Sequence, residues 1–128
     1  MKKLIYILVF LTIASLSITQ AATRTSTATG GVWGTGTTWV GGVAPTATDL
    51  AVIATTGANS VQGNAGGTSY TCAGLTINNG ATLTMYRPFT VNGTTSVTGT
   101  INFGSTRATS RLMTFNGDVT INSGGVWN

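Results

Sequence analysis

The stretch LTINNGATLTM, residues 75–85, is the part of the sequence that most directly indicates the fold. Before its Asn-Asn-Gly sequence, one threonine separates Leu75 from Ile77. After it, another threonine separates Leu83 from Met85. Alternation with a period of two directs apolar side chains to one face of a strand and threonines to the other. Because Asn and Gly tolerate turn conformations, the stretch predicts two short strands joined by a tight turn.

The same order of apolar, polar and apolar residues recurs along the rest of the chain, and no helical periodicity is found after residue 22. It recurs at residues 89–91, 101–103, 113–115 and 119–121. Turn sequences rich in Gly and Asn separate these segments. The chain beyond residue 22 is therefore predicted to be all-β.

A longer repeat underlies the alternation. LTINNG at Leu75 returns as VTINSG at Val119, VTGT at Val97 lies halfway between them, and VIATTG begins at Val52. The successive starts at positions 52, 75, 97 and 119 are almost evenly spaced. Repeats of about 20–29 residues with short strands are typical of solenoids. In a solenoid each full turn of the chain, here called a rung, buries its apolar side chains against the next rung.

A second series, FTVNG at residues 89–93 and MTFNG at residues 113–117, runs alongside the first with a similar step. We therefore predict an all-β, parallel β-helix-like solenoid of about four rungs of 22–24 residues, following a cleaved signal peptide. A β-sandwich is the alternative fold, because it also places short strands at regular intervals. The solenoid is preferred because the same Asn-Gly corner follows the same apolar-Thr-apolar triplet.

The chain divides into three expected segments. They are a signal peptide at residues 1–21, an N-terminal cap rich in Trp and Gly at residues 22–49, and solenoid rungs at residues 50–128. The last segment ends in INSGGVWN, which does not resemble the polar cap that a terminal rung needs. We therefore expect the solenoid to be truncated or to continue C-terminally.

The leader has the three parts of a secretory signal peptide. Lys2 and Lys3 precede an apolar run at residues 4–18, and Thr19-Gln20-Ala21 forms a cleavage motif, so that Ala22 begins the mature chain. The apolar run is shorter than the roughly 20 residues that span a bilayer, so no membrane span is expected after cleavage. The expected location is secreted or on a bacterial cell surface, either extracellular or associated with the outer membrane.

Composition limits the chemistry that the chain can perform. The 128 residues include six Lys and Arg, two Asp, no Glu, no His and one Cys. Cleavage removes Lys2 and Lys3, which leaves four arginines against two aspartates, a net charge of +2. This charge supplies no dense basic face, so no nucleic-acid partner is expected. Arg107 and Arg111 share one loop, which we interpret as solvated and not as an anion site.

Catalytic and metal-binding arrangements lack their usual residues. Without His there is no Ser-His-Asp or Cys-His arrangement, and no cluster of metal ligands is apparent. The two acids, Asp49 and Asp118, fall in different rungs, whereas glycosidases place a pair of carboxylates around one bond. We therefore predict no enzyme activity, no catalytic residue, no metal ligand and no cofactor. Cys72 alternates with its neighbours and is expected to be a small buried side chain.

Most of the stretch 30–128 resembles a known group of proteins. Trp33, TTW ending at Trp39, a Gly-Gly pair, Pro45 and Asp49 are followed by CAGLTINNGATLTM, FTVNG and VTGTINF. This order is similar to the N-terminal region of bacterial secreted β-solenoid surface proteins, which are autotransporter-passenger-like or adhesin-like. The eight-glycine extracellular domain has a similar opening. The resemblance implies a parallel β-helix, export to the cell surface and a larger parent protein.

On this interpretation, Trp33 and Trp39 cover the open end of the first rung, and Pro45 and Asp49 form the turn into the first strand. The alternative is that Trp33, Trp39 or Trp127 stacks on a sugar ring. Capping is preferred, because Trp33 and Trp39 open the fold and do not line its side.

The predicted function is that of a non-catalytic structural or adhesive segment. A carbohydrate-binding module is the alternative, and binding to ice or a mineral surface is a weaker one, suggested by Thr-x-Thr pairs at residues 82–84 and 98–100. The expected partner is the rest of a larger surface protein or a homotypic neighbour joined end to end, with polysaccharide as a further candidate.

Overall fold

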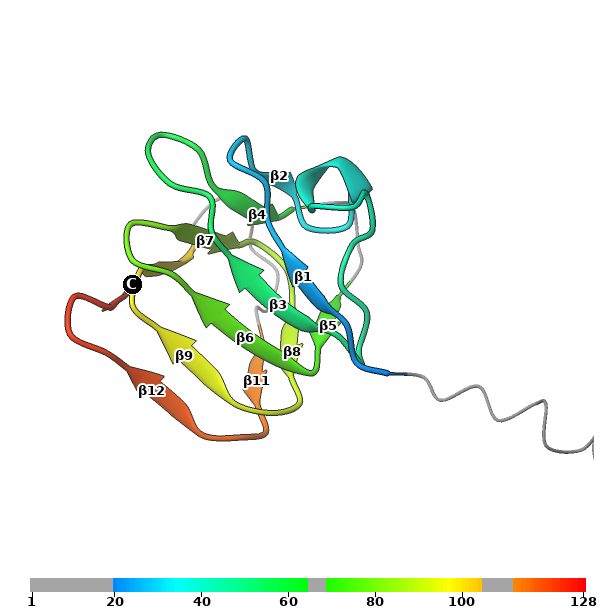
Figure 1. Cartoon of the computed structure of the whole chain (residues 1–128). Coiled ribbons are helices and arrows are strands. Elements are labelled where there is room, and N and C mark those ends of the chain that lie inside the picture. The colour runs from blue at the N-terminus through cyan, green and yellow to red at the C-terminus, as the bar shows by residue number, and fades with distance from the viewer. Residues whose placement is uncertain (1–19, 65–68, 105–111) are drawn as a thin grey trace, which may run out of the picture.

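A computed structural model describes residues 20–64, 69–104 and 112–128 (Figure 1). In this part of the chain, thirteen strands form an all-β parallel solenoid of about four turns, with rungs about 24 residues apart and no α-helix. The predicted solenoid is therefore confirmed, and the alternative β-sandwich is wrong. Of the expected segments, residues 1–19 of the signal peptide lie outside the described residues.

Three sheets form the sides of the solenoid. The first contains, in spatial order, β1 (Thr23–Thr25), β3 (Leu50–Ile53), β6 (Gly74–Ile77), β9 (Thr95–Val97) and β12 (Val119–Ile121). The second contains β13 (Val126–Trp127), β10 (Thr100–Phe103), β7 (Thr82–Met85), β4 (Val61–Gly63) and β2 (Gly31–Val32). The third contains β11 (Met113–Phe115), β8 (Phe89–Val91) and β5 (Tyr70–Cys72). Figure 1 shows the first sheet from β1 to β12 as a stack of neighbouring strands.

The chain visits the three sheets in turn, so each complete rung contributes one strand to each. All strand pairs are parallel, and each strand inside the stack bonds to the strands of the rungs before and after it. Alternate side chains point inward: Ile53, Ile77 and Val97 align with one another in the first sheet and are completely buried. The core is therefore a continuous stack of apolar layers.

The predicted register is correct for two of its four positions. Leu75 and Val119 both align with Thr95, and so occupy equivalent positions as predicted. Val97 instead aligns with Ile77, two positions further along the strand. Val52 aligns with Thr76, one position further along, and its side chain therefore points outward.

Unequal rung lengths explain these differences. In the first sheet, the step from Leu75 to its partner Thr95 is shorter than the step from Thr95 to its partner Val119. Turns of different length accommodate the different steps, so a repeat of constant length predicts some strand alignments incorrectly. The second repeat series is confirmed, since Phe89 aligns with Met113.

The two ends of the solenoid are built differently. The third sheet ends at β5, and no strand of the preceding segment pairs with it among the described residues. Residues 33–49, which include the 3-10 helix η2 (Gly36–Thr38), fold over this end instead. At the other end, β11, β12 and β13 form the last rung, and no further strand of the described chain pairs with them.

The alternation predicts different costs for two adjacent substitutions. Ile77→Ala removes buried apolar atoms between two rungs and is expected to lower the free energy of unfolding by about 2–5 kcal/mol. Thr76→Ala on the outer face of β6 is expected to cost less than about 1 kcal/mol. Urea unfolding measures both, and equal costs would contradict the assigned inner and outer faces.

Candidate functional sites at the two ends of the solenoid

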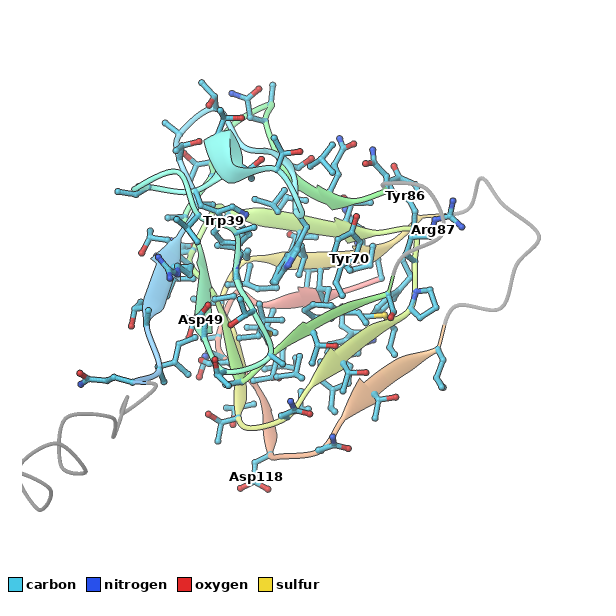
Figure 2. The ribbon with its side chains drawn as sticks, turned by 90° about the vertical axis from the view of Figure 1, so that its right-hand side faces the viewer. Trp39, Asp49, Tyr70, Tyr86, Arg87 and Asp118 are labelled. Carbon is cyan, nitrogen blue, oxygen red and sulfur yellow. The ribbon has the colours of Figure 1, made fainter. Side chains whose placement is uncertain are left out.

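The N-terminal end is closed by a cluster of aromatic side chains. Trp33 and Trp39 are each 1% exposed, and their rings meet edge to face at 5.0 Å. The Trp39 indole Nε1 donates a hydrogen bond of 2.7 Å to the Trp33 carbonyl oxygen. The Trp33 ring also packs against Phe89 at 5.0 Å and Tyr70 at 6.2 Å. Figure 2 shows Trp39 and Tyr70 at this end of the fold.

This placement is what the capping interpretation of Trp33 and Trp39 requires. Both rings cover core that no preceding rung covers, whereas stacking on a sugar needs an exposed ring face. With 1% exposure, neither side chain offers such a face. In this arrangement both rings face the core, because the cap folds inward over it.

Glycines allow the cap backbone to pack closely. A Cβ on Gly36 would collide with the backbone carbonyl of Gly42. Gly42 itself has a φ of +74°, a conformation that L side chains rarely adopt. The mixture of Trp and Gly is therefore a consequence of folding large rings beneath a tightly turned backbone.

Asp49 is the buried acid at the turn into β3. Its carboxylate accepts hydrogen bonds from the Thr46 N–H at 2.9 Å, the Thr46 hydroxyl at 2.8 Å and the Ala22 N–H at 3.1 Å. Arg24 Nε lies 3.6 Å from Oδ2. The Thr46 N–H, followed by the other donors and the Arg24 charge, lowers the pKa of Asp49 against the opposing effect of burial. Pro45 is half-buried and directly precedes this turn.

Asp118 does not join Asp49 in a common site. Asp118 is exposed before β12, whereas Asp49 precedes β3, and Figure 2 shows them at separate places. Three strand spacings of the first sheet lie between β3 and β12, which corresponds to roughly 14 Å. This is beyond the roughly 5–10 Å that separate paired carboxylates in glycoside hydrolysis.

Other chemistry is limited in the described chain. Within residues 20–64, 69–104 and 112–128, no three His, Cys, Asp or Glu residues gather as a metal site would require. In the same ranges, no helix is long and apolar enough to cross a membrane. Arg107 and Arg111, the loop pair of the sequence, lie outside the described residues.

The C-terminal end contains a second aromatic cluster, which is open. The Trp127 ring lies 5.3 Å from Phe103 and 5.2 Å from Phe115. Trp127 is 42% exposed, in contrast to the two buried tryptophans of the other end. Neither phenylalanine was singled out in the sequence, although the alternation of apolar residues at 101–103 and 113–115 would have placed both on the inner face.

Asparagines mark the corners of the last rung. Asn116, Asn122 and Asn128 each follow a strand, at a constant interval of six residues. Their side-chain amides donate to the rung below: Asn116 to Asn92 at 3.3 Å and Asn128 to Asn102 at 3.0 Å. Asn122 donates to Ser96 and Thr98. This ladder was not predicted from the sequence, although the constant interval could have indicated it.

Comparison with known protein families, with curated proteins and with solved structures finds no match to this chain. Its function is therefore inferred from the geometry of its two ends.

The hydrogen bond within the cap gives a specific test. Trp39→Phe removes the indole N–H and leaves the buried Trp33 carbonyl without that donor, so the free energy of unfolding should fall by about 1–3 kcal/mol. Val40→Ala is a control on the adjacent residue, which is 63% exposed, and should change stability by less than about 0.5 kcal/mol. Equal stability of the two variants would contradict a closed cap.

Cys72 gives a test of the core. Its thiol is completely buried and unpaired, and burial raises its pKa to about 12. Because the thiolate is the reactive form, a thiol reagent at pH 8 should label the native protein only as fast as it unfolds. Addition of urea should make labelling immediate. Immediate labelling of the native protein would show that Cys72 is accessible.

Proposed function

We propose that this chain is a non-catalytic structural or adhesive β-solenoid of the bacterial cell surface or extracellular space, and that the rest of a larger surface protein or a second copy covers its C-terminal rung. The observation that carries the proposal is the contrast between a closed N-terminal end and an open C-terminal end. A solenoid with one closed end and one open end can bind another protein segment through the open end.

The exposure of equivalent residues in successive rungs supports this proposal. Val119, Ile121 and Trp127 occupy inward-facing positions of the last rung and are 41%, 44% and 42% exposed. The residues aligned with them one rung below are at most 1% exposed; they are Thr95, Val97 and Ile101. The last rung therefore exposes side chains of the core type. A further layer of protein over this rung would bury them as fully as the equivalent side chains of the rung below.

The edges of the last strands support the same conclusion. β11, β12 and β13 each pair with one strand of the rung below and with no other strand of the described chain. Parallel strands with an open edge are templates for pairing with another chain. Apolar side chains and strand edges thus occur together on one end face.

A second copy fits this face through its own C-terminal rung. The N-terminal end of a copy is covered by the Trp33 and Trp39 cap, so head-to-tail stacking would have to displace buried rings. A two-fold arrangement instead brings identical faces together and closes after two copies. In it, β12 lies antiparallel to its counterpart and extends the first sheet of both copies.

Charge is compatible with this arrangement. Asp118 is the only charged side chain of residues 112–128. In an antiparallel pairing centred on Thr120, Asp118 lies opposite Asn122 of the second copy and not opposite another carboxylate. The face therefore contains no like-charge contact, and its apolar centre with polar corners matches the anatomy of protein interfaces.

Location and role are proposed on separate grounds. The signal-peptide pattern and the resemblance to N-terminal regions of secreted β-solenoid surface proteins support export. The absence of His and Glu from the sequence supports a role without acid–base catalysis. A paired solenoid would act as a rigid spacer or as a contact between surfaces.

Carbohydrate binding remains a second candidate, which one observation favours. Trp127 retains an exposed ring beside Phe103, as a sugar-stacking platform would. Glycan binding and self-association would compete for this ring, so binding measurements on both separate the candidates.

Self-association tests the proposal. Sedimentation equilibrium of the chain beginning at Ala22 should show a dimer, and Trp127→Ala should weaken dimerisation by about 30-fold or more, as is usual for a central interface Trp. Val126→Thr is the matched control, because Val126 is 41% exposed on the same strand but points to the outer face. It should leave dimerisation nearly unchanged.

A monomer at every concentration would contradict the second-copy proposal. A monomer that binds glycans and loses this binding on Trp127→Ala would instead support the carbohydrate-binding module. Equal effects of Trp127→Ala and Val126→Thr would show that the inner face of the last rung is not the contact.

A further inference from the structure

Ala22 is the residue at which the fold begins. Its N–H donates to Asp49 Oδ1 at 3.1 Å, and its carbonyl oxygen accepts from the Leu50 N–H at 2.8 Å. Strand pairing between β1 and β3 starts at the next residue, where Thr23 aligns with Leu50. The preceding residue, Ala21, is exposed. The cleavage motif in the sequence therefore ends at the residue after which the chain becomes held by the fold.

The acceptor at this point is a buried carboxylate whose neighbouring cation makes no hydrogen bond to it through Nε. Asp49 is 4% exposed, and its neighbouring cation is Arg24, whose Nε lies at 3.6 Å. That Nε has no hydrogen-bond partner. The other charged side chains of the described residues, Arg87 and Asp118, lie elsewhere on the solenoid (Figure 2). A second positive group at Asp49 would therefore find an acceptor already in place.

We infer that removal of residues 1–21 creates an α-ammonium group at Ala22 that is captured by Asp49, so that leader cleavage stabilises the solenoid. The inference rests on the export that is part of the proposed function. It assigns a processing site to the Ala21–Ala22 bond and a binding site for the new terminus to Asp49.

The chemistry of cleavage supplies the charge. A peptidase specific for small residues adds water across the Ala21–Ala22 bond, and the Ala21 carbonyl carbon gains the hydroxyl oxygen. The Ala22 nitrogen gains one hydrogen from water and, at neutral pH, the proton released by the new Ala21 carboxylic acid. The single N–H that bonds Asp49 in the uncleaved chain thereby becomes an ammonium with three donors.

The charged terminus strengthens a contact that the uncleaved chain already makes. A hydrogen bond between two charged groups is roughly twice as strong as one between neutral groups, and the burial of Asp49 reduces screening by water. The bond connects β1 to the turn before β3, and thus holds the first strand against the next rung. An uncleaved chain would fold with the same register but with a weaker attachment of its first strand.

Three proteins test the inference. They are the chain beginning at Ala22 with a free amine, the same chain acetylated on that amine, and a chain beginning one residue earlier at Ala21 with a free amine. Acetylation keeps one N–H but removes the charge, while the longer chain keeps the charge and moves it to an exposed residue. At pH 6.5 and low salt, the free Ala22 chain should have an unfolding equilibrium constant about tenfold smaller than either control.

The difference should depend on pH in a defined direction. A carboxylate beside an ammonium raises the pKa of the amine above the about 7.7–8.0 of a free α-amine. The added stability is therefore fully present below about pH 7.7 and is lost as the pH rises through the raised pKa. Because the pKa of Asp49 is lowered, the contribution is also lost in acid, as the pH falls through that lowered value.

Equal stability of the free and acetylated Ala22 chains at pH 6.5 would overturn the inference. So would a chain beginning at Ala21 that is as stable as the chain beginning at Ala22. Asp49→Asn should abolish the effect of acetylation on stability. If that variant does not fold, the stabilities of the three chains still test the inference. Mass spectrometry of the exported full chain should give Ala22 as its first residue, and another terminus would overturn the assigned processing site.

Failure of the inference about Ala22 and Asp49 can be distinguished from failure of the proposed function. Self-association through Trp127 is measured on the same acetylated and free chains. Dimerisation without a stability difference between them would reject the N-terminal inference alone. A stability difference in a protein that stays monomeric would reject the proposed association alone.

Discussion

Every rung of this solenoid depends on the rung beside it. A single rung is three short strands, which cannot bury inward side chains such as Ile77 or satisfy both strand edges alone. Stacking solves both problems, because backbone hydrogen bonds and apolar layers continue from one rung to the next. The same dependence makes the two ends the critical parts of the molecule, since each end has a rung with one neighbour only.

The two ends meet this constraint in different ways. Trp33 and Trp39 replace the missing neighbour of the first complete rung with buried aromatic surface, and Asp49 accepts a hydrogen bond from the Ala22 N–H just before β1. At the last rung, Trp127 also lies among aromatic rings but remains 42% exposed. One end therefore carries its cover within the chain, whereas we propose that the rest of a larger protein or a second copy covers the other end.

The sequence predicted the fold better than it predicted contacts. Period-two alternation and Asn-Gly corners identified the strands, and the alignment of Phe89 with Met113 was correct because both triplets keep the same distance from their Asn-Gly corners. Val52 and Val97 were misaligned because turns of different length separate similar triplets. The hydrogen bond between Ala22 and Asp49 joins positions far apart in the chain. The exposure of Trp127 depends on whether another strand lies over β13, which the sequence of β13 does not reveal. Spacing along the chain contains neither kind of information.

Hydrogen exchange measured at a series of protein concentrations tests the central claim that one end is closed and the other is open to a partner. Amides of β3 and β6 should be protected at every concentration, because rungs of the same chain cover both of their edges. Amides of β12 and β13 that point to the open edge, and not to the rung below, should exchange rapidly in dilute solution and gain protection as the concentration rises. Protection of β12 and β13 that does not change with concentration, or rapid exchange in the cap around Trp33 and Trp39, would contradict the account.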